Sequence, residues 1–268
     1  MNYLYLPRIK VQAANAHATS WLINAAPVMA LNMFAHNLGR NIGAFSDGVA
    51  VIHHDAQLLG EKGIAFYGRL HPQQRRGTTF INGEDYSNKN PHALSLQPTA
   101  SCHLILSLVF SFDDAFDIDA VNDFMKSARI AGGQVIGSGD PEIIGDDEKL
   151  RKRLRTGYWL IERSDLMLSQ GDPLDAVIKA TGFRQDAPEP GTLPNSWLVP
   201  TVLGYAAITG FEQRGGVREG SPHAFCESLV GLVQYVSLRD YGARPIPFWH
   251  HQWLRDDVFI IKQKEIQS

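Results

Sequence analysis

Basic side chains in this sequence are concentrated in a few short stretches rather than spread evenly. Residues 149–155 (KLRKRLR) hold five cations in seven positions, and the two leucines among them are spaced to face the protein from a helix. Residues 8–12 (RIKVQ) alternate polar and apolar side chains, as a half-buried strand does. Such local densities are typical of contacts with phosphate groups, although a solvated helix face explains residues 149–155 equally well. The candidates in these two stretches are Arg8, Lys10, Arg151 and Arg153.

A long polar section between residues 59 and 100, punctuated by Gly and Pro, is predicted to form a protruding hairpin. It combines Arg69, Arg75 and Arg76 with nearby aromatic residues. Cations beside aromatic rings suit stacking contacts with single-stranded RNA, so this section is a candidate binding element. A solvent-exposed loop without a ligand is the alternative.

Gly132 and Gly133 are predicted to end a helix whose last turns carry Lys126 and Arg129. Because glycine has no side chain, a ligand's backbone could approach closely there while the two cations meet its phosphates. An ordinary glycine cap of the helix is the alternative reading of the same pair.

The sequence lacks the spacings that catalysis and metal binding usually require. His53-His54 and His250-His251 are adjacent pairs, and neighbours in a strand point to opposite faces of a sheet. The two cysteines, Cys102 and Cys226, form no CxxC spacing and are expected to be free thiols. No G-x-S-x-G, H-E-x-x-H or P-loop is present, and no G-x-G-x-x-G follows a strand. We therefore expect no catalytic residue, no metal and no cofactor.

The composition is that of an ordinary folded protein. The chain has 268 residues, 44% hydrophobic and 20% charged, which argues against a disordered or fibrous class. The net charge of −3 provides no global positive field, so any contact with nucleic acid must be local. The first ten residues do not resemble a signal peptide, and no apolar stretch is long enough to span a membrane. We expect a cytoplasmic protein that makes no membrane contact.

The expected elements of the first half follow the order β-α-β-β-α-β. This is the order of a ferredoxin-like unit, also the scaffold of the RNA recognition motif, and it predicts an α+β fold. We expect residues 1–140 to form this palm, with the hairpin insertion at about 59–100. The expected elements are strands at 3–12, 49–52, 101–112 and 134–136, a helix from Pro27 to Gly39 or Gly43, and a helix after Asp117.

The second half, residues 141–268, is expected to add α/β elements that pack on the palm without forming an independent domain. Pro7 in the first strand predicts a bulge or an edge. The expected elements of the second half are helices at 146–154, after Asp172 and at 222–236, with strands at 158–162, 197–209 and 246–261.

Six blocks of the sequence, in order, resemble the second Csy-type subunit of type I-F CRISPR surveillance complexes, a RAMP protein of the Cas-five group. The resemblance spans nearly the whole chain. The blocks are residues 6–16 (LPRIKVQAANA), 47–53 (DGVAVIH), 128–133 (ARIAGG), 197–200 (WLVP) with Gly204-Tyr205, 223–232 (HAFCESLVGL) and 249–251 (WHH).

The resemblance implies a ferredoxin-like palm with a hairpin thumb and a non-catalytic role in antiviral defence. Such a subunit would cap the crRNA at its 5′ handle and join the large subunit to the first backbone subunit, and in a divergent branch it could also touch target DNA. Under this reading cations hold phosphates while Asn and backbone groups read base edges. The nearest candidates are Arg8, Lys10, Asn15, His17, Arg129, Gly132 and Gly133.

Two other functions remain open at this point. One is a metal-independent crRNA-processing endoribonuclease in which His17 or His71 acts as general base beside a Tyr or Lys. The other is an adaptor that touches only protein through apolar faces, such as the one expected around residues 225–236.

Overall fold

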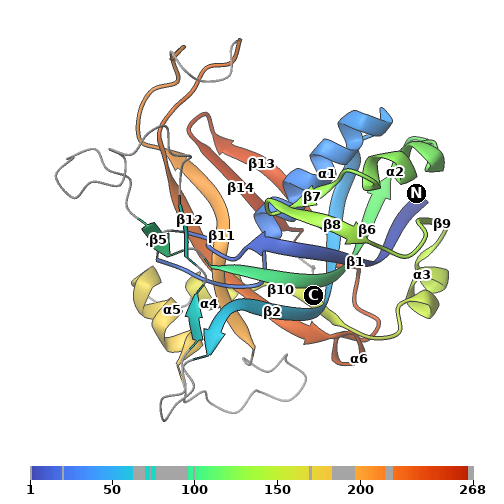
Figure 1. The fold of residues 1–268 in the computed structure, drawn as a ribbon, viewed down its shortest axis with the longest axis horizontal. Helices are drawn as coiled ribbons and strands as arrows, with labels where there is room; N and C mark the ends of the chain where they lie inside the picture. The colour runs from blue at the N-terminus through green and yellow to red at the C-terminus, as the bar shows by residue number, and fades with distance from the viewer. Residues whose placement is uncertain are drawn as a thin grey trace.

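The computed structural model describes residues 2–19, 21–62, 70–72, 74–76, 96–98, 100–168, 171–182, 197–214 and 220–264. These residues form a twelve-stranded, largely antiparallel sheet accompanied by a small number of helices (Figure 1). The predicted α+β class is therefore confirmed.

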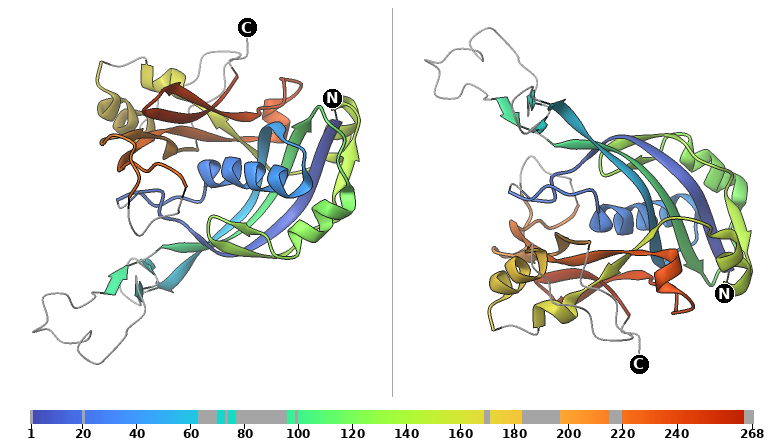
Figure 2. Two further views of the ribbon diagram at one scale, coloured as in Figure 1. Left: turned by 90° about the horizontal axis from the view of Figure 1, so that it is seen from above. Right: turned by 90° about the horizontal axis from the view of Figure 1, so that it is seen from below.

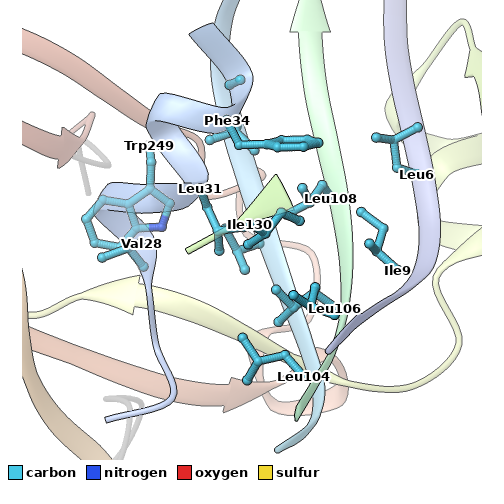
Figure 3. Close-up of a cluster of buried hydrophobic side chains, with 14 of the residues drawn as sticks. Leu6, Ile9, Val28, Leu31, Phe34, Leu104, Leu106, Leu108, Ile130 and Trp249 are labelled. Atoms are coloured by element: carbon cyan, nitrogen blue, oxygen red, sulfur yellow. The ribbon is translucent and has the colours of Figure 1, made fainter. Parts of the chain in front are cut away.

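Four strands from the first half lie in the order β2-β6-β1-β8, and each is antiparallel to its neighbour. Helices α1 and α2 contact each other and pack on one face of these strands, where leucine, isoleucine and phenylalanine side chains form the main core (Figure 3). The bounds are β1 Asn2–Asn15, α1 Val28–Ile42, β2 Ser46–Lys62, β6 Ser101–Phe112, α2 Ile118–Met125 and β8 Gly133–Gly137.

Local sequence explains where α1 begins and ends. Pro27, which lacks an N–H, occupies the N-cap position, where the backbone donors have no helical partner in any case. Gly43 ends the helix in the left-handed conformation, with φ 72°, and its N–H donates to the Gly39 carbonyl.

The opposite face of the four strands is covered at one end only. There Tyr3 and Tyr5 of β1 are buried in a second core with Leu150, Trp159 and Tyr241. These three residues come from α3 (Asp147–Arg153), β10 (Tyr158–Glu162) and α6 (Leu238–Tyr241). The predicted free sheet face is therefore present only at the other end of β1, around Lys10 and Gln12.

The second half of the chain continues the same sheet, because β10 and β13 both pair with β2. Trp249 is fully buried at this junction, and its Nε1–H donates to the Leu160 carbonyl at 3.1 Å. The strands involved are β11 Leu198–Ala207, β12 Cys226–Ser237, β13 Trp249–Arg255 and β14 Val258–Gln263.

The far ends of β2 and β6 project from the body of the molecule (Figure 2). The end of β2 pairs with β3 (Leu70–Pro72), and β4 (Gln74–Arg76) pairs with β5 (Leu96–Pro98). The remainder of the hairpin predicted at about 59–100 lies outside the described residues. The other short elements are β7 Arg129–Ile130, β9 Glu142–Ile144, α4 Ser164–Leu168 and α5 Pro173–Thr181.

Three predictions about local structure are wrong. The strand expected at 246–261 is a hairpin, in which β13 and β14 are antiparallel and joined by a turn at Asp256 and Asp257. The helix expected at 222–236 is strand β12, which pairs with β10 on one side and β11 on the other. The α2 helix ends at Met125, so Gly132 and Gly133 do not terminate it; they lie in a β-hairpin between β7 and β8. The strands predicted at 101–112 and 158–162 have the observed bounds.

Among the residues that the structure describes, no helix has both the length and the apolar character needed to cross a lipid bilayer.

Candidate nucleic-acid interface

Arg8 lies at a bulge in β1, as the preceding proline predicts. The register with β6 shifts between Leu6 and Ile9, and Arg8 has a positive φ of 51°. Its backbone N–H donates to Ser107 Oγ at 2.9 Å, and its guanidinium Nη2 donates to Thr156 Oγ1 at 2.9 Å. The bulge therefore turns an exposed guanidinium over the uncovered part of the sheet.

Beyond Arg8 the sheet face is open, and we call this surface the open sheet face. Lys10 and Gln12 are exposed on it, while Ile9 and Val11 are buried against the helices on the other side. The pairing places Lys10 opposite Ile105, which lies opposite Asp55 on β2, and places Gln12 opposite Gln134. The open sheet face comprises Lys10, Gln12, Asp55, Gln57, His103, Ile105, Gln134 and Ile136.

The chemistry of this face suits a single-stranded polymer with polar bases. Amides such as Gln12 and Gln134 can both donate and accept hydrogen bonds, and Lys10 supplies a positive charge. Ile136 is 60% exposed and offers an apolar surface on which a base could pack. Gln134 and His103 were not identified as candidates from the sequence. The alternation of residues 133–137 was a signal that Gln134 and Ile136 share a face.

The glycine pair forms the turn of the β7–β8 hairpin. Ala131 and Gly132 both have positive φ, 49° and 75°, as the two central residues of a type I′ turn require. Gly132 is exposed with no neighbour within 4 Å of a Cβ built on it, whereas Gly133 is buried against the backbone of Ala14. The close approach at Gly133 is therefore made by the chain's own β1, and only Gly132 is open to a ligand.

Arg129 is exposed on β7, beside this turn. No ion pair or side-chain hydrogen bond is recorded for it among the described residues. Lys126, predicted to act with it, caps the C-terminus of α2 instead and forms an ion pair with Asp123 at 2.6 Å. The structure thus leaves Arg129 available and engages Lys126 locally.

The cations of α3 make contacts within the fold. Arg153 forms a bidentate pair with Glu142, with distances of 2.7 and 2.8 Å, and Lys152 pairs with Glu148. Arg151 donates to the carbonyls of Gly242 and Arg244. The helix therefore presents much less unpaired charge than its sequence indicates, and Arg151 serves to attach α3 to the turn after α6.

The predicted arginines of the projecting hairpin are described only in part. Arg75 and Arg76 belong to β4, and the structure does not describe their side chains. Arg69 lies outside the described residues. Their role in RNA binding stays a prediction.

Asn15 and His17 lie at a different place, beside an apolar groove. Asn15 Oδ1 accepts from the His17 N–H at 3.1 Å, and Asn15 Nδ2 donates to the His17 carbonyl, so the two residues form a local turn. The groove has a volume of about 650 Å³. Its aromatic lining residues are Tyr205, Phe211, Trp253 and Phe259.

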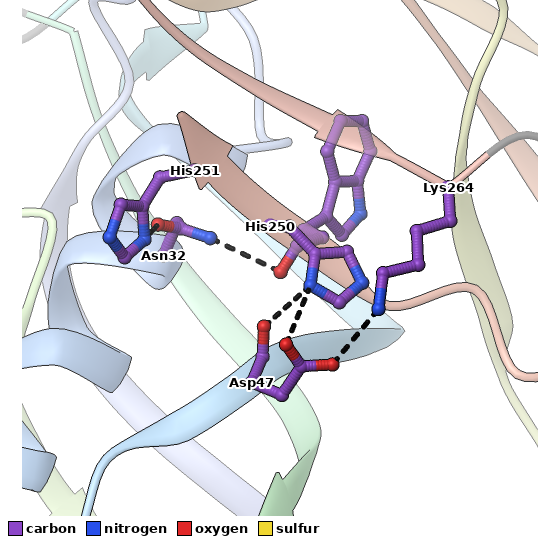
Figure 4. A network of polar contacts seen from close by, with 6 residues as sticks. Asn32, Asp47, His250, His251 and Lys264 are labelled. Atoms are coloured by element: carbon purple, nitrogen blue, oxygen red, sulfur yellow. Dashed lines mark hydrogen bonds and ion pairs between the residues drawn. The ribbon is translucent and has the colours of Figure 1, made fainter. Parts of the chain in front are cut away.

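The two histidines of each adjacent pair have different partners, as expected for neighbouring residues in a strand. His53 is buried against the Tyr235 ring on one face of β2, and His54 bonds Ser107 on the other. His250 Nδ1 lies 3.8 Å from a carboxylate oxygen of Asp47, and the other oxygen of that carboxylate forms an ion pair with Lys264 (Figure 4). His251 Nδ1 lies within hydrogen-bond distance of Asn32 Oδ1, at 3.2 Å. Within the described part of the chain, no group of three or more His, Cys, Asp or Glu side chains could hold a metal ion.

Comparison of the chain with known proteins identifies its family. The family described as CRISPR-associated protein (Cas_Csy2) matches residues 4–254, which is most of the chain. The chain belongs to the Csy2 family. A relative named CRISPR-associated protein Csy2, from Pseudomonas aeruginosa (strain UCBPP-PA14), is 23% identical over 307 residues, which cover 92% of this chain and 90% of the relative.

Family membership makes this Csy2-family chain a subunit of a type I-F CRISPR system and confirms the resemblance drawn from the six sequence blocks. Two of those blocks coincide with the surface described above. Residues 6–16 contain Arg8, Lys10 and Gln12, and residues 128–133 contain Arg129 and the hairpin turn.

Proposed function

We propose that this chain is a non-catalytic RNA-binding subunit that caps the 5′ handle of the crRNA in a type I-F interference complex. In this role it joins the large subunit to the crRNA-bound backbone subunits and acts in the cytoplasm in antiviral defence. The observation that carries the proposal is the open sheet face, where Lys10, Gln12 and Gln134 are exposed beside Arg129 and Gly132.

The strand order supports a ferredoxin-like palm. In that fold the two helices cover one face of a four-stranded antiparallel sheet and the other face is free for RNA. Here α1 and α2 pack on one face of β2-β6-β1-β8, and the uncovered part of the other face carries the polar row. Local cations on a chain of net charge −3 fit a ligand held at one defined surface.

The proposal is tested with the purified chain and a fluorescently labelled guide RNA, measured by anisotropy. We expect RNA with its cognate handle to bind about tenfold or more tightly than RNA with a scrambled handle. Lys10→Ala and Arg129→Ala should each weaken binding, and Arg255→Ala, an exposed arginine of β13 paired with Asp257, is the matched control. Equal affinity for both RNAs, or variants that behave like the control, would contradict handle recognition.

The endoribonuclease alternative is tested with the same protein. His17, one candidate base, lies at the turn beside the apolar groove, away from the open sheet face. Incubation with repeat RNA in EDTA separates the two functions, because cleavage at one defined position would favour the enzyme. We expect intact RNA.

A purely protein-binding adaptor is favoured by one observation, the exposure of large apolar side chains near the groove. Trp253 is 58% exposed and Phe225 is 62% exposed, and large apolar side chains grouped on a surface are typical of protein-interaction sites. Under this alternative the chain would enter the complex without RNA contacts. Assembly from nuclease-treated subunits, with no RNA crosslinks to this chain, would support the adaptor and contradict our proposal.

A further inference from the structure

A second cavity, of about 340 Å³, lies where the covered and uncovered parts of the sheet face meet. Segments far apart in the sequence build it: β1, β2, the residues around the start of β10, and the start of α6. Three of its nine lining residues are arginines, and none is acidic. The lining residues are Arg8, His54, Arg155, Thr156, Gly157, Tyr158, Ser237, Leu238 and Arg239.

Gly157 allows the cavity to form. Its φ of 130° is rarely adopted by other residues, and a Cβ built on it would lie 2.4 Å from Ile52 Cγ2 and 2.9 Å from His54 Nδ1. Its carbonyl accepts from the Leu238 N–H at 3.1 Å. A glycine at this position therefore brings the Arg155 segment down onto β2 and connects it to the start of α6.

The cavity wall is fixed by one buried serine. Ser107 Oγ accepts from the Arg8 N–H at 2.9 Å and lies 2.7 Å from His54 Nε2. Burial, together with the charge of Arg8 and with His53, lowers the pKa of His54 to about 4, so its imidazole is neutral near pH 7. The positive charge of the site thus belongs to the arginines.

These arginines are not neutralised within the described part of the chain. Arg8 donates to the hydroxyl of Thr156, a neutral partner, and Arg155 and Arg239 are exposed with no recorded ion pair. Lys152 and Arg153, a few residues before Arg155 in the sequence, are by contrast each paired with a glutamate. Three unpaired guanidinium groups at one cavity are the chemistry that binds a phosphate.

We propose that this cavity, the arginine pocket, binds one phosphate of an RNA backbone through Arg8, Arg155 and Arg239. The assignment rests on the proposed function, which supplies the RNA. It is favoured over a free anion by continuity: Ser107 and Ile105, two residues apart on β6, share a face, and Lys10 lies opposite Ile105. A strand leaving the pocket would continue across the open sheet face.

The test uses the full chain and guide RNAs in which one phosphate at a time is replaced by a neutral methylphosphonate. Wild-type protein should lose about tenfold in affinity at one position of the handle. In Arg239→Ala and Arg155→Ala the same replacement should cost several-fold less than in wild type, because each variant has already lost one of the three guanidinium groups that contact this phosphate. Lys152→Ala is the matched control and should retain the wild-type pattern. Urea unfolding of each variant verifies that it is folded.

Each outcome has a distinct meaning. Handle-specific binding with no phosphate position coupled to Arg239 or Arg155 overturns the pocket and leaves the proposed function intact. Absence of guide RNA binding overturns both. If the scan is flat while inorganic phosphate raises the melting temperature of wild type but not of Arg239→Ala, the pocket holds a free anion and our RNA assignment is wrong.

Discussion

Gly133 lies directly against the backbone of Ala14, so closely that a Cβ built on Gly133 would be 2.6 Å from the Ala14 nitrogen. This contact fixes the β7–β8 hairpin to the end of β1, and the Asn15 N–H donates to the Ala131 carbonyl at 2.8 Å beside it. The hairpin turn and the polar row of β1 are therefore held as one surface.

Gly133→Ala should destabilise the fold by about 1–3 kcal/mol, because backbone atoms must move to admit the methyl group. Gly137→Ala, four residues along on β8, has nothing within 4 Å of its Cβ and is the matched control. The free energy of unfolding in urea measures both. Equal stability of the two variants would mean that the backbone contact at Gly133 is not present in solution.

Stability should fall as the pH is lowered from 6.5 towards 4. Burial lowers the pKa of His53 to about 4, against the opposing influence of Asp55 and of a backbone hydrogen bond with Ala25. The unfolded chain therefore takes up a proton near pH 6.5 that the folded chain does not, and unfolding becomes easier below that pH. For His53 alone the loss at pH 5 is about 2 kcal/mol.

His53→Phe isolates this contribution, since it keeps a ring beside Tyr235 and removes the titrating group. The change in unfolding free energy between pH 7.5 and pH 5 should be about 2 kcal/mol smaller in the variant than in wild type. An unchanged pH dependence would show that His53 is not held neutral in the fold.

Trp249→Phe should cost about 2 kcal/mol, because it removes one of the two side-chain hydrogen bonds to the Leu160 carbonyl, leaving the one from Gln263 Nε2, and opens space in the core. Trp253→Phe is the control on the same strand, since Trp253 is 58% exposed and Trp249 is fully buried. Thermal or urea unfolding compares the two. A similar loss for both would argue against Trp249 as the joint between β13 and the first half of the chain.

The two cysteines should differ strongly in reactivity. Cys102 is buried, and burial raises the pKa of its thiol to about 11, whereas Cys226 is exposed at the apolar groove. Titration of the native protein with a thiol reagent should show one fast thiol, and Cys226→Ser should abolish the fast phase. A fast phase that persists in Cys226→Ser would mean that Cys102 is accessible.

Strong local patterns allowed much of the fold to be predicted. Residues 101–112 form a long, mostly apolar run, which is typical of a strand buried along most of its length or of a buried helix, and the turn signals around it favour the strand. The helix prediction for residues 222–236 was wrong because the apolar positions of this segment repeat at helical spacing, although it forms strand β12. The strand is half-buried along much of its length, and Gly231, packed against Leu203, was a signal for the sheet that periodicity concealed.

The candidate binding surface was less predictable, because ion pairs and long-range packing decide which cations are free. Sequence alone could not show that Glu142 neutralises Arg153. Nor could it show that Arg155 and Arg239 line the same cavity, since this depends on the pairing of Tyr158 with Ser237 between β10 and β12. Arg8 and Lys10 were accessible to prediction because strand alternation is a local property.

The most direct test of our central claim is photocrosslinking of a guide RNA that carries 4-thiouridine in its handle, within the assembled complex, followed by mass spectrometry of this chain. We expect crosslinked peptides from Asn2–Asn15 and from the hairpin of Arg129 and Gly132. Crosslinks confined to the opposite surface, such as the outer face of α1, or none to this chain, would contradict it.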